Sequence, residues 1–315
     1  MAFAPEFTGV VAWINTKPLK LKDVEGKVVL VDFWTYSCVN CVRTLPHLVA
    51  TYEKYQKHGL IIIGVHTPEF DFEKKLENVK NAVKDFGIAY PVAVDSDWQI
   101  WNAYGNSYWP RQYLLNGNGE IVWDHIGEGG YDDIEWHIRT ELEKLGAKLP
   151  PMKSEKEEKP GFLARLRTTR ETYLGSARSE GFGSASVCLK GSCHRHIDRN
   201  EEHDPDVVYL SGDWEQMPEF IEHADGEEGY ILQKYTAKEV NLVMAPKKKS
   251  CTLVVLLDGK PIPKDFRGED VDAKGTVTID SPRMYRLVKS NDAGEHELKL
   301  VTKSDGLQAF AFTYG

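Results

Sequence analysis

The sequence predicts a mixed α/β domain followed by an all-β domain of the β-sandwich or jelly-roll type. Apolar, β-rich runs alternate with helical periodicities in the first half of the chain. In the second half the helical pattern disappears and short alternating strands replace it. A Lys/Glu-rich run with prolines separates the two halves, and the length of 315 residues exceeds what one hydrophobic core usually fills.

The first half begins with a buried strand and the helix that follows it. Residues 27–34, KVVLVDFW, form a near-continuous apolar run that is typical of a central strand buried on both faces. Residues 38–58 place apolar side chains at helical spacing and stop at Gly59, a residue favoured just after a helix. Residues 60–65, LIIIGV, predict a second buried strand. The unit therefore starts as β-α-β.

The rest of the first half continues this alternation and ends in a hairpin and a helix. A charged helical stretch at 72–86 leads into a short strand at 91–94. Strands at 111–115 and 120–126 are joined by Asn-Gly-Asn-Gly, which favours the positive φ angles of a tight turn. An amphipathic helix at 131–145 closes the unit. These elements predict a mixed sheet covered by helices on both faces.

The second half reads as strands separated by Gly, Asp, Pro and Asn turns. Short strands in such number are typical of a β-sandwich or jelly roll. We expect strands at 229–235, 239–245, 250–257, 275–279, 285–289, 294–302 and 307–314. The predicted organisation is an α/β domain at 1–148, a charged linker at 149–167, and a β domain at 168–315 with an irregular first segment.

Composition excludes several classes of partner. Hydrophobic residues make up 41% of the chain and charged residues 28%, as in ordinary globular proteins. A net charge of −9 repels nucleic-acid phosphates, and the three lysines at 247–249 fit a solvated turn, so we expect no nucleic-acid partner. We also expect no membrane insertion, because no apolar run approaches the ~18 residues that a spanning helix needs.

The start of the chain bears on where the protein works. Residues 1–7 lack the basic and apolar regions of a signal peptide. As the chain stands, this predicts a cytoplasmic protein. A processed or trimmed form of an extracytoplasmic protein would look the same, and that alternative stays open.

Reactive chemistry concentrates at the junction between the first predicted strand and its helix, where Cys38, Val39, Asn40 and Cys41 follow one another. The N-terminus of a helix carries partial positive charge, which stabilises a thiolate on Cys38 and makes it the nucleophile. Cys41, one turn further in, is expected to be the buried resolving thiol. Such a pair needs no metal or other cofactor besides its own disulfide. A lone CxxC can also be half of a zinc site, but its place in a βαβ setting favours redox chemistry.

Several motifs resemble the thioredoxin superfamily. They are the run VDFW, Asp32 six positions before Cys38, the CxxC itself, and Pro46 five positions after Cys41. The segments WTYSCVNC, GVHTPEF and WNAYGNSYWP resemble more specifically the thioredoxin-like DipZ/TlpA group. ETYLGSAR and LSGDW resemble the start of the carbohydrate-binding-module-like β domain of DipZ proteins, so the resemblance covers nearly the whole chain. We expect no CcdA-like membrane portion before it.

The resemblance implies a thiol:disulfide oxidoreductase that exchanges electrons between protein disulfides and an unidentified donor. Asp32 resembles the buried carboxylate that shuttles a proton to and from the resolving cysteine, and burial would raise its pKa. A purely structural acceptor is the alternative for Asp32. Trp109 and Pro110 match the cis-proline that faces the CxxC, so the backbone of Trp109 is expected to pair with an extended substrate segment.

This sequence also departs from thioredoxin. Ser37 replaces the usual tryptophan, and Val39 and Asn40 replace Gly-Pro, so a reduction potential cannot be transferred. The absence of a histidine between the cysteines, where the oxidant DsbA type has one, favours a reductant. Four further residues are expected to line the site or, alternatively, to pack its loops or face solvent: Tyr36, Arg43, His66 and Glu69.

Two other functions remain open. Thr35, three residues before Cys38, is also a peroxiredoxin feature, although Val31 stands where peroxiredoxins have proline, so a thiol-dependent peroxidase is an alternative. A carbohydrate-binding protein with an accessory redox domain is another. Exposed aromatic platforms often bind sugars, and Trp214, Tyr230 and Tyr235 are the candidates, with burial in the core as the alternative for each.

The remaining cysteines form a separate question. Cys188 and Cys193 lie near His194, His196 and His203, which are zinc-ligand types without a standard spacing. A local disulfide or two free thiols fit better, so we expect no metal. The fifth cysteine, Cys251, lies on the same face of a predicted strand as nearby leucine and valine residues. It is expected to be a buried core thiol.

Overall fold

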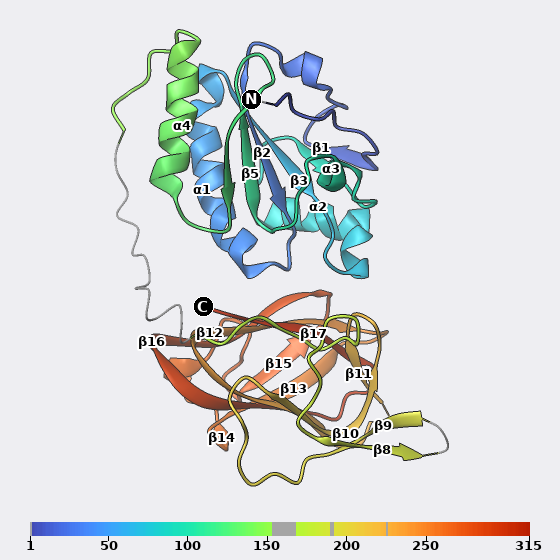
Figure 1. Cartoon of the computed structure of the whole chain (residues 1–315). Helices are drawn as coiled ribbons and strands as arrows, with labels where there is room; N and C mark the ends of the chain where they lie inside the picture. The colour runs from blue at the N-terminus through green and yellow to red at the C-terminus, as the bar shows by residue number, and fades with distance from the viewer. Residues whose placement is uncertain (1, 153–167, 190–191, 225) are drawn as a thin grey trace. The chain divides into compact units, whose positions relative to one another are not determined.

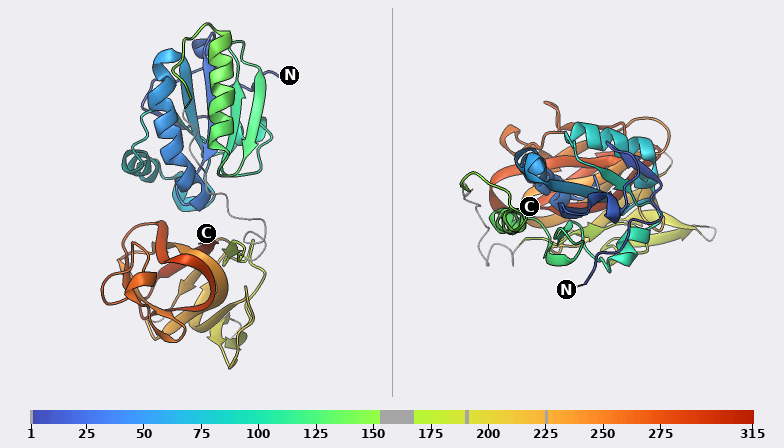
Figure 2. Two further views of the ribbon diagram at one scale, coloured as in Figure 1. Left: turned by 90° about the vertical axis from the view of Figure 1, so that its left-hand side faces the viewer. Right: turned by 90° about the horizontal axis from the view of Figure 1, so that it is seen from above.

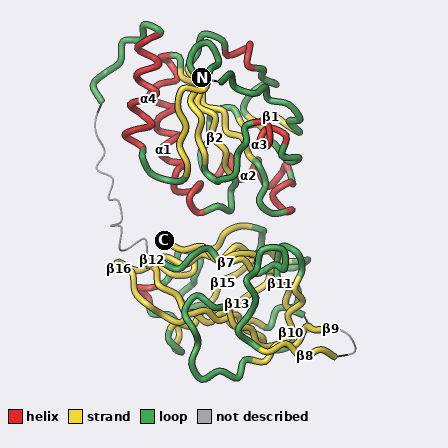
Figure 3. The backbone as a smooth tube through the Cα atoms, in the orientation of Figure 1, coloured by secondary structure: helices red, strands yellow, loops and turns green. Residues whose placement is uncertain are grey.

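A computed structural model describes residues 2–152, 168–189, 192–224 and 226–315. The chain divides into two compact units, 1–159 and 160–315 (Figure 1). The predicted linker, 149–167, lies mostly outside the described residues, and the predicted domain limits stay a prediction. Figure 3 shows that the long helices belong to the first unit, whereas the second is almost entirely strand and loop.

The first unit is built on a six-stranded mixed sheet with the order β1-β4-β3-β2-β5-β6. Strands β2, β3 and β4 run parallel, whereas β1, β5 and β6 are antiparallel to their neighbours. The strands are β1 (Ala12–Ile14), β2 (Val28–Trp34), β3 (Leu60–His66), β4 (Val92–Val94), β5 (Arg111–Leu115) and β6 (Ile121–Ile126). The predicted mixed sheet is confirmed. Strand β1 was missed because three half-exposed residues carry no readable alternation.

Helices α1 (Val39–Tyr55) and α4 (Tyr131–Lys144) agree closely with the predictions. The 3₁₀ turn η2 (Gln56–His58) extends α1, and Gly59 ends it with a φ of 105° that favours glycine. The second predicted helix was wrong in one respect. It is divided into a 3₁₀ turn, η3 (Asp71–Lys74), and α2 (Leu76–Asp85).

The break between these two elements lies at Lys75, whose backbone is extended with a ψ of 113°. Helical periodicity continues across this residue in the sequence, which is why the pattern did not reveal it. Two further short elements were not predicted, η1 (Leu21–Val24) and α3 (Gln99–Ala103), because neither is long enough to show a period.

The two faces of this sheet are covered by different parts of the chain. Helices α1 and α4 lie side by side in both ribbon views (Figures 1 and 2). The side chains of Asp32 and Trp34 share one face of β2, because residues two apart in a strand point the same way. The opposite face packs against the N-terminal segment and α3 through a buried cluster that includes Phe7, Val31, Phe33, Ile63, Ile100 and Tyr113.

The second unit is a single connected sheet of eleven strands. Its main path is β14-β13-β16-β12-β17-β11-β10-β9-β8, with β15 paired to β13 and β7 to β17. The strands are β7 (Thr172–Tyr173), β8 (Ala185–Leu189), β9 (Ser192–Ile197), β10 (Val208–Gln216), β11 (Ile221–His223), β12 (Gly229–Pro246), β13 (Cys251–Leu257), β14 (Lys260–Pro261), β15 (Thr276–Ile279), β16 (Arg283–Thr302) and β17 (Leu307–Tyr314), with one 3₁₀ turn, η4 (Lys264–Phe266).

Two pairs of predicted strands are in fact single long strands. The predictions at 229–235 and 239–245 both fall on β12, and those at 285–289 and 294–302 both fall on β16. Strands β12 and β16 pair along most of their length, with a register shift between Ala237 and Glu239. An irregularity of this kind bends a strand without ending it, so the residues there resembled a turn in the sequence.

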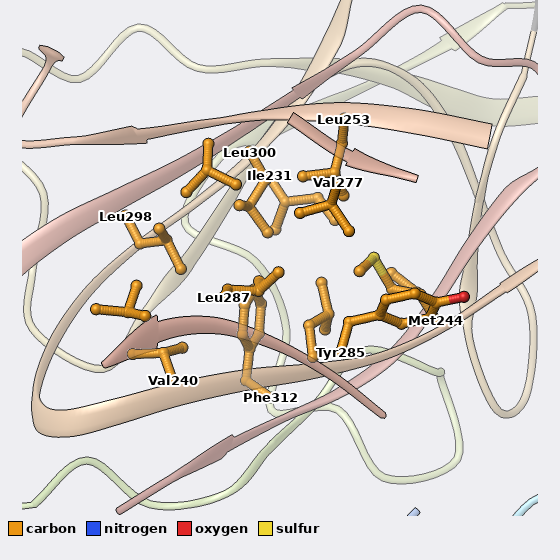
Figure 4. Close-up of a cluster of buried hydrophobic side chains, with 14 of the residues drawn as sticks. Ile231, Val240, Met244, Leu253, Val277, Tyr285, Leu287, Leu298, Leu300 and Phe312 are labelled. Carbon is orange, nitrogen blue, oxygen red and sulfur yellow. The ribbon is translucent and has the colours of Figure 1, made fainter. Parts of the chain in front are cut away.

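The core of the second unit is apolar and contains two of the aromatic residues considered for sugar binding. Figure 4 shows part of it, where Ile231, Leu253 and Leu300 point toward Tyr285 and Phe312. Trp214 and Tyr235 are both 1% exposed, so neither offers a sugar-binding platform at the surface. Cys251 is also 1% exposed, which confirms it as a core thiol.

Among the described residues, no helix has the length and apolar character needed to span a lipid bilayer.

Candidate redox site

The two cysteines lie at the start of α1, where β2 ends. Cys38 is the N-cap residue in extended backbone, and the N–H of Cys41 donates to its Sγ at 3.4 Å. Both are free thiols; Cys38 is partly exposed, whereas Cys41 is only 1% exposed. An accessible sulfur at a helix N-terminus and a shielded one a turn later is the arrangement that the sequence predicted.

Burial has a direct consequence for the second thiol. It raises the pKa of Cys41 well above its ordinary value, and the neighbouring Cys38 and the charge of Asp32 act in the same direction. The Cys41 thiol is therefore protonated at neutral pH.

Asp32 lies on β2 beneath this helix and is 1% exposed. Burial raises its pKa to about 7, although a hydrogen bond from Gln112 acts in the opposite direction. Gln112 Nε2 donates to Asp32 Oδ1 at 2.8 Å. A carboxyl group that titrates near neutral pH can both accept and release a proton under ordinary conditions.

The strand beside Asp32 leaves room for aromatic groups. Gly64 on β3 is the register partner of Asp32. A Cβ at Gly64 would lie 3.0 Å from Trp34 Nε1 and 3.1 Å from the ring of Tyr90, so a larger residue would displace these buried rings. Glycine at this position therefore keeps the layer above the carboxyl group closely packed.

The peptide bond between Trp109 and Pro110 is cis, as predicted. Cys38 Sγ donates to the carbonyl oxygen of Trp109 at 3.8 Å, which places this backbone beside the first cysteine. The indole of Trp109 packs against Trp101 with centroids 4.2 Å apart, and its Nε1 donates to Thr67 O at 3.1 Å. The loop is thus held by an aromatic contact and a hydrogen bond.

The four other predicted residues occupy different places. Tyr36 is buried and stacks on His66, with ring centroids 5.5 Å apart. Burial raises the pKa of Tyr36, and it lowers the pKa of His66 to about 3, so both rings are neutral at physiological pH. Arg43 pairs with Glu128 at 3.5 Å and is partly exposed.

The fourth of these residues, Glu69, contributes its backbone rather than its carboxylate to a buried contact. Its N–H donates to Glu73 Oε2 at 2.6 Å. Glu69 is partly exposed at the end of the loop that follows β3. The structure therefore brings Tyr36 and His66 together in a packed layer and leaves Arg43 and Glu69 at its edge.

Sequence reasoning missed Glu73, a carboxylate that organises the loop before Cys38. It is 0% exposed and lies in η3. Its Oε1 accepts from Thr35 Oγ1 at 2.5 Å, from Ser37 Oγ at 2.7 Å and from Ser37 N at 3.2 Å. Its Oε2 accepts from the backbone N–H groups of Glu69 and Phe70.

These five contacts join the loop after β2 to the loop after β3. Burial raises the pKa of Glu73 to about 7, while the hydrogen bonds from Thr35, Ser37 and Phe70 lower it and the charge of Glu69 raises it. In the sequence Glu73 is one acid in a charged stretch, so no local signal separates it from a helix surface. Gln112 was also missed, because no local signal marks it and its partner Asp32 is 80 positions away.

The predicted zinc alternative concerns the second unit. Cys188 lies on β8 and Cys193 on β9, but the side chains of 187–193 are outside the described residues. His203 contacts Asp198 Oδ2 at 2.9 Å and Glu297 Oε2 at 2.8 Å, one through each ring nitrogen. Within the described part of the chain, no group of three or more His, Cys, Asp or Glu side chains could hold a metal ion.

Comparison with known proteins gives a family for both halves of the chain. Residues 2–124 match the AhpC/TSA family, and residues 169–315 match the thioredoxin-like C-terminal domain family. Protein DipZ of Mycobacterium tuberculosis is 37% identical over 317 residues, which is 99% of this chain and 43% of DipZ. The thiol-disulfide oxidoreductase ResA of Bacillus anthracis is 33% identical over 136 residues, covering 43% of this chain and 75% of ResA.

A solved structure is also similar to part of this chain. The thioredoxin domain of a thiol-disulfide oxidoreductase from Bacteroides vulgatus is 27% identical and has a TM-score of 0.37, covering 44% of this chain and 96% of that domain.

The fold of the first unit and its paired cysteines define a thioredoxin-like protein. The chain belongs to the family of thioredoxin-like thiol-disulfide oxidoreductases that includes ResA and DipZ. It spans about 43% of the length of DipZ.

Proposed function

We propose that this chain reduces protein disulfides through the dithiol of Cys38 and Cys41, with a mixed disulfide as the intermediate. The observation that carries the proposal is the contrast between a partly exposed Cys38 at the start of α1 and a buried Cys41 above Asp32. Accessibility suits the first sulfur for attack on a large substrate. Shielding suits the second for an intramolecular step.

The reaction begins when the thiolate of Cys38 attacks one sulfur of a substrate disulfide. That disulfide breaks, and its other sulfur leaves as a thiolate that takes up a proton. Cys41 then loses its proton to Asp32 and attacks Cys38 Sγ, which releases the second substrate thiol and leaves a Cys38–Cys41 disulfide. Two electrons and two protons from an unidentified donor restore the dithiol.

The loop at the cis-proline supports a role in substrate binding. The carbonyl oxygen of Trp109 lies 3.8 Å from Cys38 Sγ, where an extended segment beside a substrate cystine could pair with it. The indole of Trp109, packed on Trp101 and hydrogen-bonded to Thr67, positions this part of the loop. Tyr36 and His66 pack on each other behind the cysteine loop, and Arg43 and Glu69 are partly exposed beside it.

For the second unit we propose a role in recruiting or positioning the substrate protein, on a β-sandwich or jelly-roll scaffold. A sugar ligand has little support from its aromatic residues, because Trp214 and Tyr235 lie in the core. Tyr230 is partly exposed, but its hydroxyl donates to Asp198 at 3.1 Å and the Nζ of Lys299 lies 3.7 Å from its ring centroid.

A thiol-dependent peroxidase is the second candidate, because residues 2–124 match the AhpC/TSA family. The geometry gives it less support. Thr35 is 0% exposed and its Oγ1 donates to Glu73 at 2.5 Å, so this hydroxyl is not free to hold a peroxide beside Cys38. Peroxide consumption by the reduced chain, measured beside insulin reduction, separates the two candidates.

The test of the proposal is insulin reduction with dithiothreitol as electron donor. Cys38→Ser should abolish the reaction, and Cys41→Ser should accumulate a mixed disulfide that a non-reducing gel resolves. Cys251→Ala is the matched control, because Cys251 is a free buried thiol outside the site. Equal activity of the Cys38→Ser variant and the unchanged chain would contradict the proposal.

A further inference from the structure

Gln112 is the side chain that contacts the carboxyl group of Asp32. The two residues are register partners on the antiparallel strands β2 and β5, so their side chains share a face. Both are almost completely buried, and Nε2 of Gln112 donates to Oδ1 of Asp32 at 2.8 Å. Water therefore cannot substitute for this contact easily.

The other end of the same amide has no partner. Gln112 Oε1 is a buried oxygen without a hydrogen bond in the described part of the chain. Buried polar atoms usually have partners, and leaving one without is costly. The nitrogen of an amide carries two donors, which suit a carboxylate. Its oxygen is an acceptor, which suits the O–H of a protonated carboxyl group.

The surroundings of Asp32 offer little else that could respond to its charge. From α1 it faces Cys41, and from the segment before β4 it faces Tyr90, because the charge of Asp32 acts on both. Burial raises the pKa of Tyr90, and its hydroxyl has no hydrogen bond among the described residues. From β3 it faces Gly64, which has no side chain. Within the described residues, no cation is ion-paired with Asp32.

We propose that Gln112 is a positioning residue whose side-chain amide stabilises Asp32 in both of its protonation states. While Asp32 is ionised, the NH₂ group donates to it and keeps it ready to accept a proton. When the proton of Cys41 has moved to Asp32, the amide turns by half a rotation and Oε1 accepts a hydrogen bond from the new O–H. One proton moves from sulfur to oxygen, and no electrons move in this step.

This inference rests on the proposed function, because it concerns the step in which Cys41 attacks Cys38. That step can be observed alone. In a chain with serine at positions 188 and 193, 5,5′-dithiobis(2-nitrobenzoate) reacts first with Cys38. Attack by Cys41 then releases a second thionitrobenzoate at a rate that does not depend on reagent concentration. The rate of this second release, followed from pH 5 to pH 9, is the measurement.

Gln112→Met keeps the length of the side chain but neither donates nor accepts. The variant loses both contacts, but the hydrogen bond to the ionised carboxylate is the stronger of the two. We therefore expect its pH profile to shift upward by about one pH unit, a tenfold change in the ionisation constant. Gln112→Lys should shift the profile downward, because a cation favours the ionised form. A general loss of structure would not move the profile in opposite directions, and this pair keeps the test valid if either variant is less stable.

Two controls complete the test. Gln308→Met is matched, because Gln308 Nε2 also donates to a carboxylate, Glu222 Oε2, at 2.8 Å in the second unit. It should leave the profile unchanged. In an Asp32→Asn chain, Gln112→Met should change the rate less than twofold, because its effect acts through Asp32.

Three outcomes would overturn the inference. The first is an unchanged profile in both Gln112 variants, and the second is a shift of both in the same direction. The third is an undiminished effect of Gln112→Met in the Asp32→Asn chain. Failure of the proposed function is a separate result. If the chain with Gln112 unchanged gives no second thionitrobenzoate release, both the proposed function and this inference are overturned.

Discussion

Acids in the two units differ in how deeply they are buried and in what surrounds them: Asp32 and Glu73 are buried, whereas Asp198 is only partly buried and Asp258 is exposed. In the first unit, burial raises the pKa of Asp32 and of Glu73 to about 7, and no cation in the described residues pairs with either. In the second unit, Asp198 and Asp258 each contact a histidine ring at 2.9 Å. Burial acts to raise their pKa too, but hydrogen bonds and the histidines outweigh it, and the pKa of each is lowered.

The difference separates reactive chemistry from structural stabilisation. Acids that titrate near pH 7 are typical of sites where protons move, and they usually cost stability. Contacts with histidine favour the ionised form of Asp198 and Asp258, so these acids lose their charge only well below physiological pH. The comparison predicts that substitution of Asp32 changes rates and their pH dependence. Substitution of Glu73 should weaken the loop that it organises, and substitutions in the second group should change stability alone.

The largest expected effect is that of Asp32→Asn on attack by Cys41. We expect the second thionitrobenzoate release to slow about 100-fold at pH 8, which is typical of losing a general base. At pH 5.5 the effect should be small, because Asp32 is already protonated there. Glu222→Gln, a control on a buried acid of the second unit, should change the rate less than twofold. An equal loss at both pH values would show that Asp32 is structural.

A second prediction concerns the pH dependence of stability in each unit. Because the pKa of Asp32 and of Glu73 is raised to about 7, both carboxyl groups stay protonated in the folded first unit up to about pH 7. In the unfolded chain they lose their protons near pH 4. The stability of the first unit should therefore fall by about 5 kcal/mol from pH 5 to pH 8, about half from each group. Lowered pKa values have the opposite sign, so the contribution of Asp198 and Asp258 is lost only as the pH falls below their unfolded value of 3.8.

Hydrogen exchange with mass spectrometry, corrected for the intrinsic pH dependence of exchange, reports on both units in one chain. The first unit should be protected more strongly at pH 5 than at pH 8, and Asp32→Asn should reduce that difference. Equal pH dependence of the two units would contradict the comparison.

Glu73→Gln should destabilise the first unit by about 2 kcal/mol, because the amide nitrogen replaces an oxygen that accepts buried donors. Glu141→Gln is a suitable control on a mostly buried acid of α4, whose Oε1 contacts Lys144 at 2.6 Å. Denaturant unfolding of the two variants measures the difference. If Glu73→Gln proved as stable as the control, the five contacts would have little energetic weight.

The smallest expected effect is that of His203→Gln. It should destabilise the second unit by about 1 kcal/mol, because the ring connects Asp198 to Glu297 near the surface. Insulin reduction and its pH profile should stay unchanged. A change in the pH profile would mean that the two units do not divide chemistry and stabilisation as described.

The sequence revealed those parts of the site that depend on local patterns. Cys38 and Cys41 are three positions apart, Asp32 lies on the strand just before them, and Pro110 is marked by a motif. Glu73 and Gln112 could not be found in this way. The partners of Glu73 in the loop before Cys38 are 36 and 38 positions away, and the partner of Gln112 is 80 positions away. Only the pairing of strands and the return of a loop bring them together.

The same distinction explains the fold predictions. Buried strands such as β2 and β3 are specified by their own apolar runs and were placed within a residue or two. Strand β12 was divided in two because the register shift near Ala237 depends on its partner strand rather than on local composition. The extended backbone at Lys75 divides a stretch whose sequence is periodic throughout. A hydrophobic pattern averaged over neighbouring residues cannot detect such a break.

The most direct test of the account is a redox titration of Cys38 and Cys41 in glutathione or dithiothreitol buffers. The account predicts a single two-electron transition on the reducing side, closer to the potential of thioredoxin, about −270 mV, than to that of DsbA, and abolished by Cys41→Ser. A potential near −120 mV, as in the oxidant DsbA, would reverse the proposed direction of electron flow. The absence of any transition would contradict the assignment of these two cysteines as a redox centre.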